Sequence, residues 1–109
     1  MSYRIKWTDT ARQDYYEILE YLKENFGMNI SERFSQKVEQ ELLLISEMPK
    51  MFPVSQLFQG LRRAVVVRQV SMYYLEIKNE VIIIRLYDNR RSPEDISNEL
   101  ENEIKSLEG

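Results

Sequence analysis

The sequence contains no cysteine and no histidine. Without cysteine the chain has no disulfide and no thiolate nucleophile. Without histidine it lacks the commonest general base and the commonest zinc ligand. It has only three glycines, which form no glycine-rich phosphate loop, and its carboxylates follow no metal-ligand spacing. We therefore expect no cofactor and no metal site.

Long apolar runs are also missing. No stretch approaches the ~20 apolar residues of a membrane-spanning helix. The N-terminus, MSYRIKWTD, lacks the apolar segment of a signal peptide. With 43% hydrophobic and 30% charged residues, a chain of 109 residues can build one core. The sequence thus predicts a single domain over residues 1–109 that is cytoplasmic and has no membrane partner.

The charge is distributed unevenly along the chain, although its net value is only −3. Residues 8–48 hold 4 Lys/Arg and 9 Asp/Glu, residues 50–91 hold 8 and 3, and residues 94–109 hold one and 6. A basic segment between two acidic ones can form a positive surface patch. The alternative is that the acidic helices neutralise the basic segment within the molecule.

The N-terminal half is typical of a strand followed by two helices. Residues 3–7 alternate between apolar and charged side chains, as a half-buried strand does. Thr8 is a suitable N-cap for a helix. Apolar residues then recur at spacings of three and four through residues 11–26 and again through residues 30–45. Gly27 separates the two runs, so the sequence predicts an antiparallel helical hairpin.

The C-terminal half is typical of three strands and a last helix. The segments RRAVVV, MYYLEIK and VIIIRLY are rich in β-branched and aromatic residues. Ser92-Pro93-Glu94-Asp95 is a helix start. The acidic helix over residues 94–109 has one apolar edge, which we expect to dock on the protein itself: Ile96, Leu100, Ile104 and Leu107. The order β-α-α-β-β-β-α predicts an α+β fold with the helical hairpin packed on one face of a small antiparallel sheet.

Strand alternation predicts which side chains share a face of this sheet. If Ile82, Ile84 and Leu86 pack on the hairpin, the opposite face gathers polar and aromatic residues: Arg62, Arg68, Tyr74, Glu76, Arg85 and Tyr87. Arg90 and Arg91 lie at its edge. Guanidinium groups among aromatic rings suit phosphates and stacked bases, so this arginine face is a candidate nucleic-acid site. The alternatives are a solvated face without function and a face shielded by the acidic C-terminal helix.

An ordered set of short motifs runs through the chain: Lys6-Trp7-Thr8-x-x-Ala11, Met48-Pro49, Gly60-Leu61-Arg62-Arg63, Tyr73-Tyr74 and Tyr87-Asp88-Asn89-Arg90-Arg91-Ser92-Pro93-Glu94. Over roughly residues 3–96 this set resembles the RelE/ParE superfamily of bacterial type II toxins. The resemblance implies a small toxin encoded beside an antitoxin, whose disordered segment wraps the toxin and folds on binding.

The two branches of the superfamily imply different activities. ParE-like members inhibit DNA gyrase by binding it, whereas RelE-like members are ribosome-dependent endoribonucleases that cut mRNA. The Asp-x-Arg-Arg-x-Pro ending and the long hairpin resemble the ParE-like branch more, so we expect a gyrase inhibitor. Its target- or antitoxin-binding residues would be Arg62, Arg68, Tyr74, Arg85, Tyr87, Arg90 and Arg91.

The ribonuclease remains an alternative. RNA cleavage needs a base, an acid and cations around the phosphate, for which the candidates are Arg62, Glu76, Arg85, Tyr87 and Arg90. RelE-like members often carry Tyr or His after the last strand, whereas residues 96–99 read ISNE. A third hypothesis is a non-toxic interaction module of the same fold. The expected partners are a cognate antitoxin and either gyrase or the ribosome with mRNA, and the expected assembly is a homodimer or a toxin–antitoxin hetero-oligomer.

Overall fold

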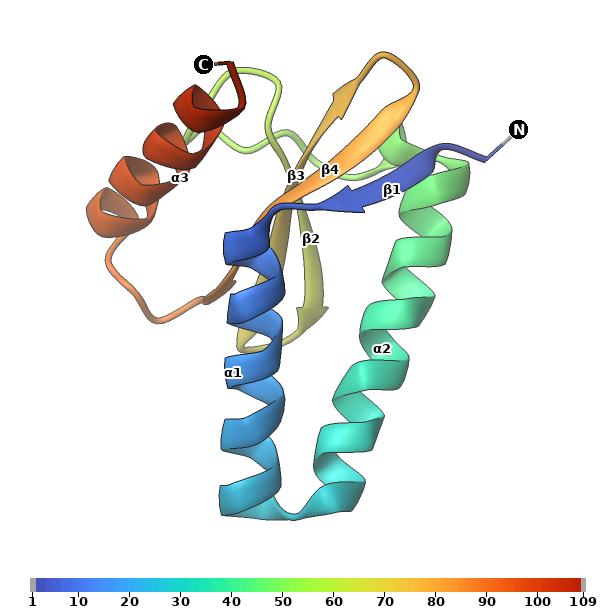
Figure 1. The fold of residues 1–109 in the computed structure, drawn as a ribbon, viewed down its shortest axis with the longest axis vertical. Helices are drawn as coiled ribbons and strands as arrows, with labels where there is room; N and C mark the ends of the chain where they lie inside the picture. Colours follow the sequence, from blue (N-terminus) through green and yellow to red (C-terminus); the bar gives the residue numbers. More distant parts are fainter. Residues whose placement is uncertain (1, 109) are drawn as a thin grey trace.

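The computed structural model describes residues 2–108. Along the chain it contains β1 (Arg4–Trp7), α1 (Asp9–Phe26), α2 (Met28–Glu47), the short 3-10 helix η1 (Pro49–Met51), β2 (Arg62–Val67), β3 (Val70–Ile77), β4 (Glu80–Asp88) and α3 (Pro93–Glu108) (Figure 1). The predicted order β-α-α-β-β-β-α is confirmed. Within residues 2–108, no helix combines the length and the apolar composition that crossing a membrane requires.

The four strands form one sheet in the order β1-β4-β3-β2. Strands β2, β3 and β4 are antiparallel, as predicted, but β1 pairs in parallel with β4, so the sheet is mixed. Lys78 and Asn79 connect β3 to β4, and both have positive φ. Positive φ at both central residues is typical of the two-residue type I′ turn, whose twist matches that of the strands it joins.

The sheet lies between two helical layers (Figure 1). On one face the hairpin of α1 and α2 covers the first core, which includes Phe34, Val38, Ile45, Ala64, Met72, Tyr74, Val81, Ile83 and Leu86. On the other face α3 and the loop before β2 cover the second core, which includes Leu61, Tyr73, Leu75, Ile84, Tyr87, Ile96, Leu100 and Ile104. The apolar edge of α3 thus docks on the protein itself through its first three members, while Leu107 is exposed.

Thr8 fixes the start of α1 against the sheet. Its Oγ1 accepts a hydrogen bond from the Ala11 backbone N–H at 3.0 Å, which confirms the predicted N-cap. The same hydroxyl donates to the Ile84 carbonyl at 2.9 Å, and the Thr8 backbone N–H donates to the Ile83 carbonyl at 3.1 Å. At the other end of α1, Gly27 alone joins the two helices, with a φ of 97° that residues with side chains rarely adopt.

A bulge in β4 decides which side chains share a face. Tyr73 pairs with Arg85, but its neighbour Tyr74 pairs with Ile83, so Ile84 is an extra residue in β4. Residues directly opposite each other in a ladder point to the same face. The bulge therefore places Arg85 on the face of Tyr73, away from Tyr74 and Ile83.

The predicted faces were wrong, and within β4 the cause is this bulge. Ile82 and Ile84 pack under α3, not on the hairpin, whereas Leu86 packs on the hairpin as predicted. Tyr74 points toward the hairpin and Tyr87 toward α3, so these two side chains lie on opposite faces. The predicted arginine face is therefore divided between the two sides of the sheet.

Candidate functional site

Tyr74 and Arg62 hold the loop after α2. Tyr74 is fully buried and its hydroxyl donates to the Pro49 carbonyl. Burial raises the pKa of Tyr74 to about 12. Arg62, opposite Tyr74 in the ladder, donates to the Phe52 carbonyl at 2.6 Å and to the Lys50 carbonyl at 3.2 Å. The expectation that Tyr74 lies on an exposed face is therefore wrong.

Glu76 lies near Tyr74 and the loop after α2, far from Tyr87. The Glu76 carboxylate is 3.9 Å from the Lys50 ammonium. In the β3–β4 ladder Glu76 pairs with Val81, five residues of β3 away from Ser71, the partner of Tyr87. At about 3.3 Å per residue this separates Glu76 from Tyr87 by roughly 17 Å. Arg68 is exposed in the turn between β2 and β3. The five candidate ribonuclease residues thus do not converge on one site.

Arg85 is the centre of a half-buried ion-pair network. Its Nε and Nη2 donate to the Asp14 carboxylate at 2.7 and 3.0 Å, and the Leu86 backbone N–H donates to the same carboxylate at 3.1 Å. Its Nη1 lies 3.5 Å from a carboxylate oxygen of Glu99 on α3. The Arg85 and Asp14 side chains are only 13% and 11% exposed. Burial by itself lowers the pKa of Arg85, but the hydrogen bond and charge of Asp14 outweigh burial and raise it.

Tyr87 lies beneath α3, and two guanidinium groups stack on its ring. The guanidinium carbons of Arg85 and Arg91 are 4.7 and 5.1 Å from the centre of its ring. Arg91 also pairs with Glu99, so one acidic residue of α3 contacts both arginines. The Tyr87 hydroxyl is buried and meets no hydrogen-bond partner among residues 2–108. Burial raises the pKa of Tyr87 well above its ordinary value.

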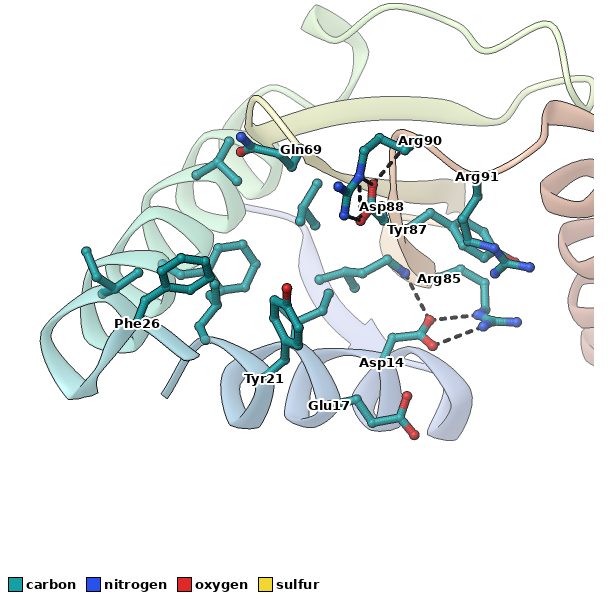
Figure 2. Close-up of a pocket in the computed structure, with 17 residues that line it drawn as sticks. Asp14, Glu17, Tyr21, Phe26, Gln69, Arg85, Tyr87, Asp88, Arg90 and Arg91 are labelled. Atoms are coloured by element: carbon teal, nitrogen blue, oxygen red, sulfur yellow. Dashed lines mark hydrogen bonds and ion pairs between the residues drawn. The ribbon is translucent and has the colours of Figure 1, made fainter. Parts of the chain in front are cut away.

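A groove of about 680 Å³ opens between the hairpin and the end of β4 (Figure 2). Helices α1 and α2 form its apolar wall, where the rings of Tyr21 and Phe26 stand with centroids 6.3 Å apart. These two side chains are 56% and 60% exposed. The facing polar wall is formed by Gln69, Asp88, Arg90 and Arg91. Exposed aromatic rings beside a concave surface are typical of a binding site.

Asp88 shapes the polar wall. Its carboxylate accepts hydrogen bonds from the Arg90 backbone N–H at 2.9 Å and from the Arg90 Nη2 at 2.7 Å, and its carbonyl accepts from the Arg91 N–H at 3.1 Å. The Arg90 side chain is nevertheless 80% exposed. The hydrogen bonds from Arg90 lower the pKa of Asp88 and raise that of Arg90. Arg90 is therefore held in place and accessible at the same time.

The groove was missed in the sequence because its aromatic rings resemble core residues at helical spacing. A second stripe of residues on α1 could have indicated the groove from the sequence. Asp14, Glu17 and Tyr21 recur at spacings of three and four beside the buried stripe, and all three line the groove. In the part of the chain that the structure describes, no cluster of acidic residues is arranged to hold a metal ion.

A family model for the ParE toxin of type II toxin-antitoxin systems, parDE, matches residues 5–93. The chain belongs to the ParE toxin family. The match confirms the predicted superfamily, and it ends where α3 begins, so most of α3 lies beyond it. A search of curated proteins found no match.

Solved structures of toxins share the ParE fold. A chain of the chromosomal ParDE system from P. aeruginosa superposes with a TM-score of 0.69 and 18% identity, over 80% of this chain and 96% of that one. The RelBE2 toxin-antitoxin complex from Mycobacterium tuberculosis gives 0.58 and 19%, over 82% and 100%. A double-arginine mutant of E. coli RelE in the free state gives 0.60 and 13%, over 98% and 99%. At these identities the likeness shows the fold.

Proposed function

We propose that this toxin acts by binding DNA gyrase and that a cognate antitoxin neutralises it. The observation that carries the proposal is that the Arg85 and Tyr87 side chains are largely buried and already in contact with other residues of the protein. Both side chains are held under α3 by contacts with Asp14, Glu99 and Arg91. A ribonuclease needs groups free to move protons and to meet a phosphate. The Tyr87 hydroxyl is buried, its pKa is raised, and the Arg85 guanidinium is already paired, which favours inhibition by binding.

The groove supports the binding part of the proposal. It offers a partner two exposed rings on one wall and accessible guanidinium groups on the other. Tyrosine and arginine are enriched among the residues that carry binding energy at protein interfaces. A disordered antitoxin segment with apolar side chains would bury Tyr21 and Phe26 when it folds into the groove.

The first experiment compares the two activities in one preparation. The purified toxin is assayed for inhibition of gyrase supercoiling and for mRNA cleavage in a translation extract. We expect supercoiling to be inhibited while the mRNA stays intact. The Arg90→Ala variant should inhibit less, whereas Arg12→Ala, which removes an arginine outside the groove, should inhibit like the wild type. Cleavage that depends on ribosomes, with normal supercoiling, would replace the proposal with the ribonuclease alternative.

A second experiment addresses the antitoxin. The product of the neighbouring gene is co-expressed with the toxin, and growth is measured. We expect this protein to restore growth with the wild-type toxin. Rescue should be weaker with the Tyr21→Ala/Phe26→Ala variant, because the antitoxin loses two rings of the apolar wall. Tyr16→Ala is the matched control, since Tyr16 is equally exposed on α1 but does not line the groove. Equal rescue of all three would show that the antitoxin binds elsewhere.

A further inference from the structure

Asn89 joins the two chain segments that form the polar wall of the groove. Its side-chain amide donates to the Arg68 carbonyl at 2.9 Å, and its backbone N–H donates to the Gln69 carbonyl at 2.7 Å. Both acceptors belong to the turn between β2 and β3. Asn89 itself lies between Asp88 and Arg90, in the segment that follows β4. One residue therefore ties the Gln69 part of the wall to the arginine part.

The amide of Asn89 is held in one orientation. Its Oδ1 accepts from the Ser71 hydroxyl at 2.8 Å, and that hydroxyl in turn accepts from the Arg63 Nε at 2.9 Å. A guanidinium can only donate and a backbone carbonyl can only accept. The hydrogen bonds therefore run in one direction, from Arg63 through Ser71 and Asn89 to the Arg68 carbonyl. Ser71 is fully buried, and in such surroundings a hydrogen bond that begins at a charged donor is stronger than a neutral one.

The turn after β4 does not need the Asn89 side chain. Asp88 makes this turn with its own carboxylate and carbonyl, which accept from the backbone N–H groups of Arg90 and Arg91. A side chain that only favoured the turn would bond within it. The Asn89 side chain instead points back to β3 and to the β2–β3 turn. Its contacts fix where the turn lies on the molecule.

We propose that Asn89 is a positioning residue for the groove. Through Ser71 and the β2–β3 turn it holds Arg90 and Arg91 in place, so that the partner meets a preformed polar wall. A preformed wall strengthens binding because fewer groups lose freedom on association. This inference rests on the proposed function, in that the groove is the surface through which the toxin binds.

The first test measures order in the free protein. ¹⁵N relaxation gives the order parameters of the Arg90 and Arg91 amides. Ser71→Ala is the most informative variant. It changes no residue of the polar wall, and it removes the hydroxyl that donates to the Asn89 Oδ1. We expect the order parameters to fall from about 0.85 toward about 0.6 in Ser71→Ala and in Asn89→Ala. Asn102→Ala makes the same chemical change as Asn89→Ala at an exposed position of α3 and should leave them unchanged.

A third variant, Asn89→Asp, is included in case the alanine variants do not fold. Asn89→Asp retains the acceptor for Ser71 but places a second oxygen against the Arg68 carbonyl, so it should loosen the same two amides. Thermal unfolding of each variant shows whether the fold persists. If Arg90 and Arg91 stay as ordered as in the wild type in all the folded variants at Ser71 and Asn89, the proposal is overturned, whatever the target is.

The second test asks whether Asn89 acts through the arginines. The toxin concentration that half-inhibits supercoiling is measured for Ser71→Ala in the wild-type and Arg90→Ala backgrounds. Loss of one bridging hydrogen bond should raise this concentration roughly fivefold in the wild-type background. The increase should be smaller when Arg90 is absent, and an equal increase in both backgrounds contradicts positioning. A wild-type toxin that leaves gyrase active refutes the proposed function alone, and the order parameters then decide the role of Asn89.

Discussion

Arg85 of β4 and Asp14 of α1 form a two-point ion pair that ties the helical hairpin to the sheet. The Asp14 carboxylate also accepts the Leu86 backbone N–H, so three donors converge on it. Both side chains are largely buried. Arg85 therefore has little surface to offer a target, and its pairing serves the fold first. Arg90, which is exposed at the groove, is the better probe of binding.

The Arg85→Ala substitution should lower the stability of the fold strongly. It leaves the Asp14 carboxylate buried without its main partner, which costs about 3–5 kcal/mol in comparable buried pairs. Urea unfolding measures the free energy. Arg90→Ala is the comparison and should lower the unfolding midpoint much less, because the Arg90 side chain is in solvent and its ion pair with Asp88 is exposed. A midpoint for Arg85→Ala equal to that of the wild type would contradict the structural role of the pair.

Tyr74→Phe should weaken the attachment of the loop after α2. The substitution removes the donor to the Pro49 carbonyl and leaves a buried acceptor unpaired, at a cost of about 1–3 kcal/mol. The measurement is again urea unfolding, with Tyr16→Phe as the matched control because the Tyr16 side chain is exposed. Equal stability of the two variants would mean that solvent replaces the lost hydrogen bond.

Asp88 should titrate below the ordinary aspartate range. The hydrogen bonds from Arg90 stabilise its charged form, so its pKa is lowered in the folded state. A lowered pKa stabilises the fold above the unfolded value of about 3.9, and this stabilisation is lost as the pH falls through the folded value. NMR titration of the Asp88 carboxyl carbon measures the pKa directly. In Arg90→Ala it should return toward about 3.9, and in Arg12→Ala it should stay low.

Leu100→Ala should loosen α3 from the sheet. Leu100 is fully buried in the second core, and truncation of such a residue costs about 2–5 kcal/mol. Hydrogen exchange should quicken along α3 first, because α3 is held mainly by this core and by Glu99. Leu107→Ala removes the same atoms at an exposed position and should change little. If α3 exchanged as slowly in Leu100→Ala as in Leu107→Ala, the docking of α3 through Leu100 would be contradicted.

The secondary structure could be predicted because each element has a local signal. Thr8 caps α1, Gly27 separates the two long helices, and Pro93 stands at the start of α3. Such signals depend on residues next to one another in the chain. Strand pairing does not, and the parallel partnership of β1 with β4 was not found in the sequence.

The faces of the sheet could not be predicted for a physical reason. Residues 81–84 read VIII, so every position of this part of β4 is apolar and suits either core. The bulge at Ile84 carries no glycine or proline to mark it. It is stabilised from afar, where Thr8 bonds to the Ile83 and Ile84 carbonyls. The ion pair of Arg85 with Asp14 and the bonds of Asn89 with Ser71 depend on the same long-range arrangement.

The place of β1 in the sheet has a consequence for synthesis. In the ladder Arg4 lies beside Glu80 and Trp7 beside Ile83, so the first strand made pairs with the last. While the ribosome makes the chain from its N-terminus, β1 and the hairpin behind it lack their neighbour until β4 has emerged. Contacts between distant parts of a chain also form late in folding. A nascent toxin therefore completes its sheet, and with it the polar wall of the groove, only after β4 and the segment behind it have left the ribosome.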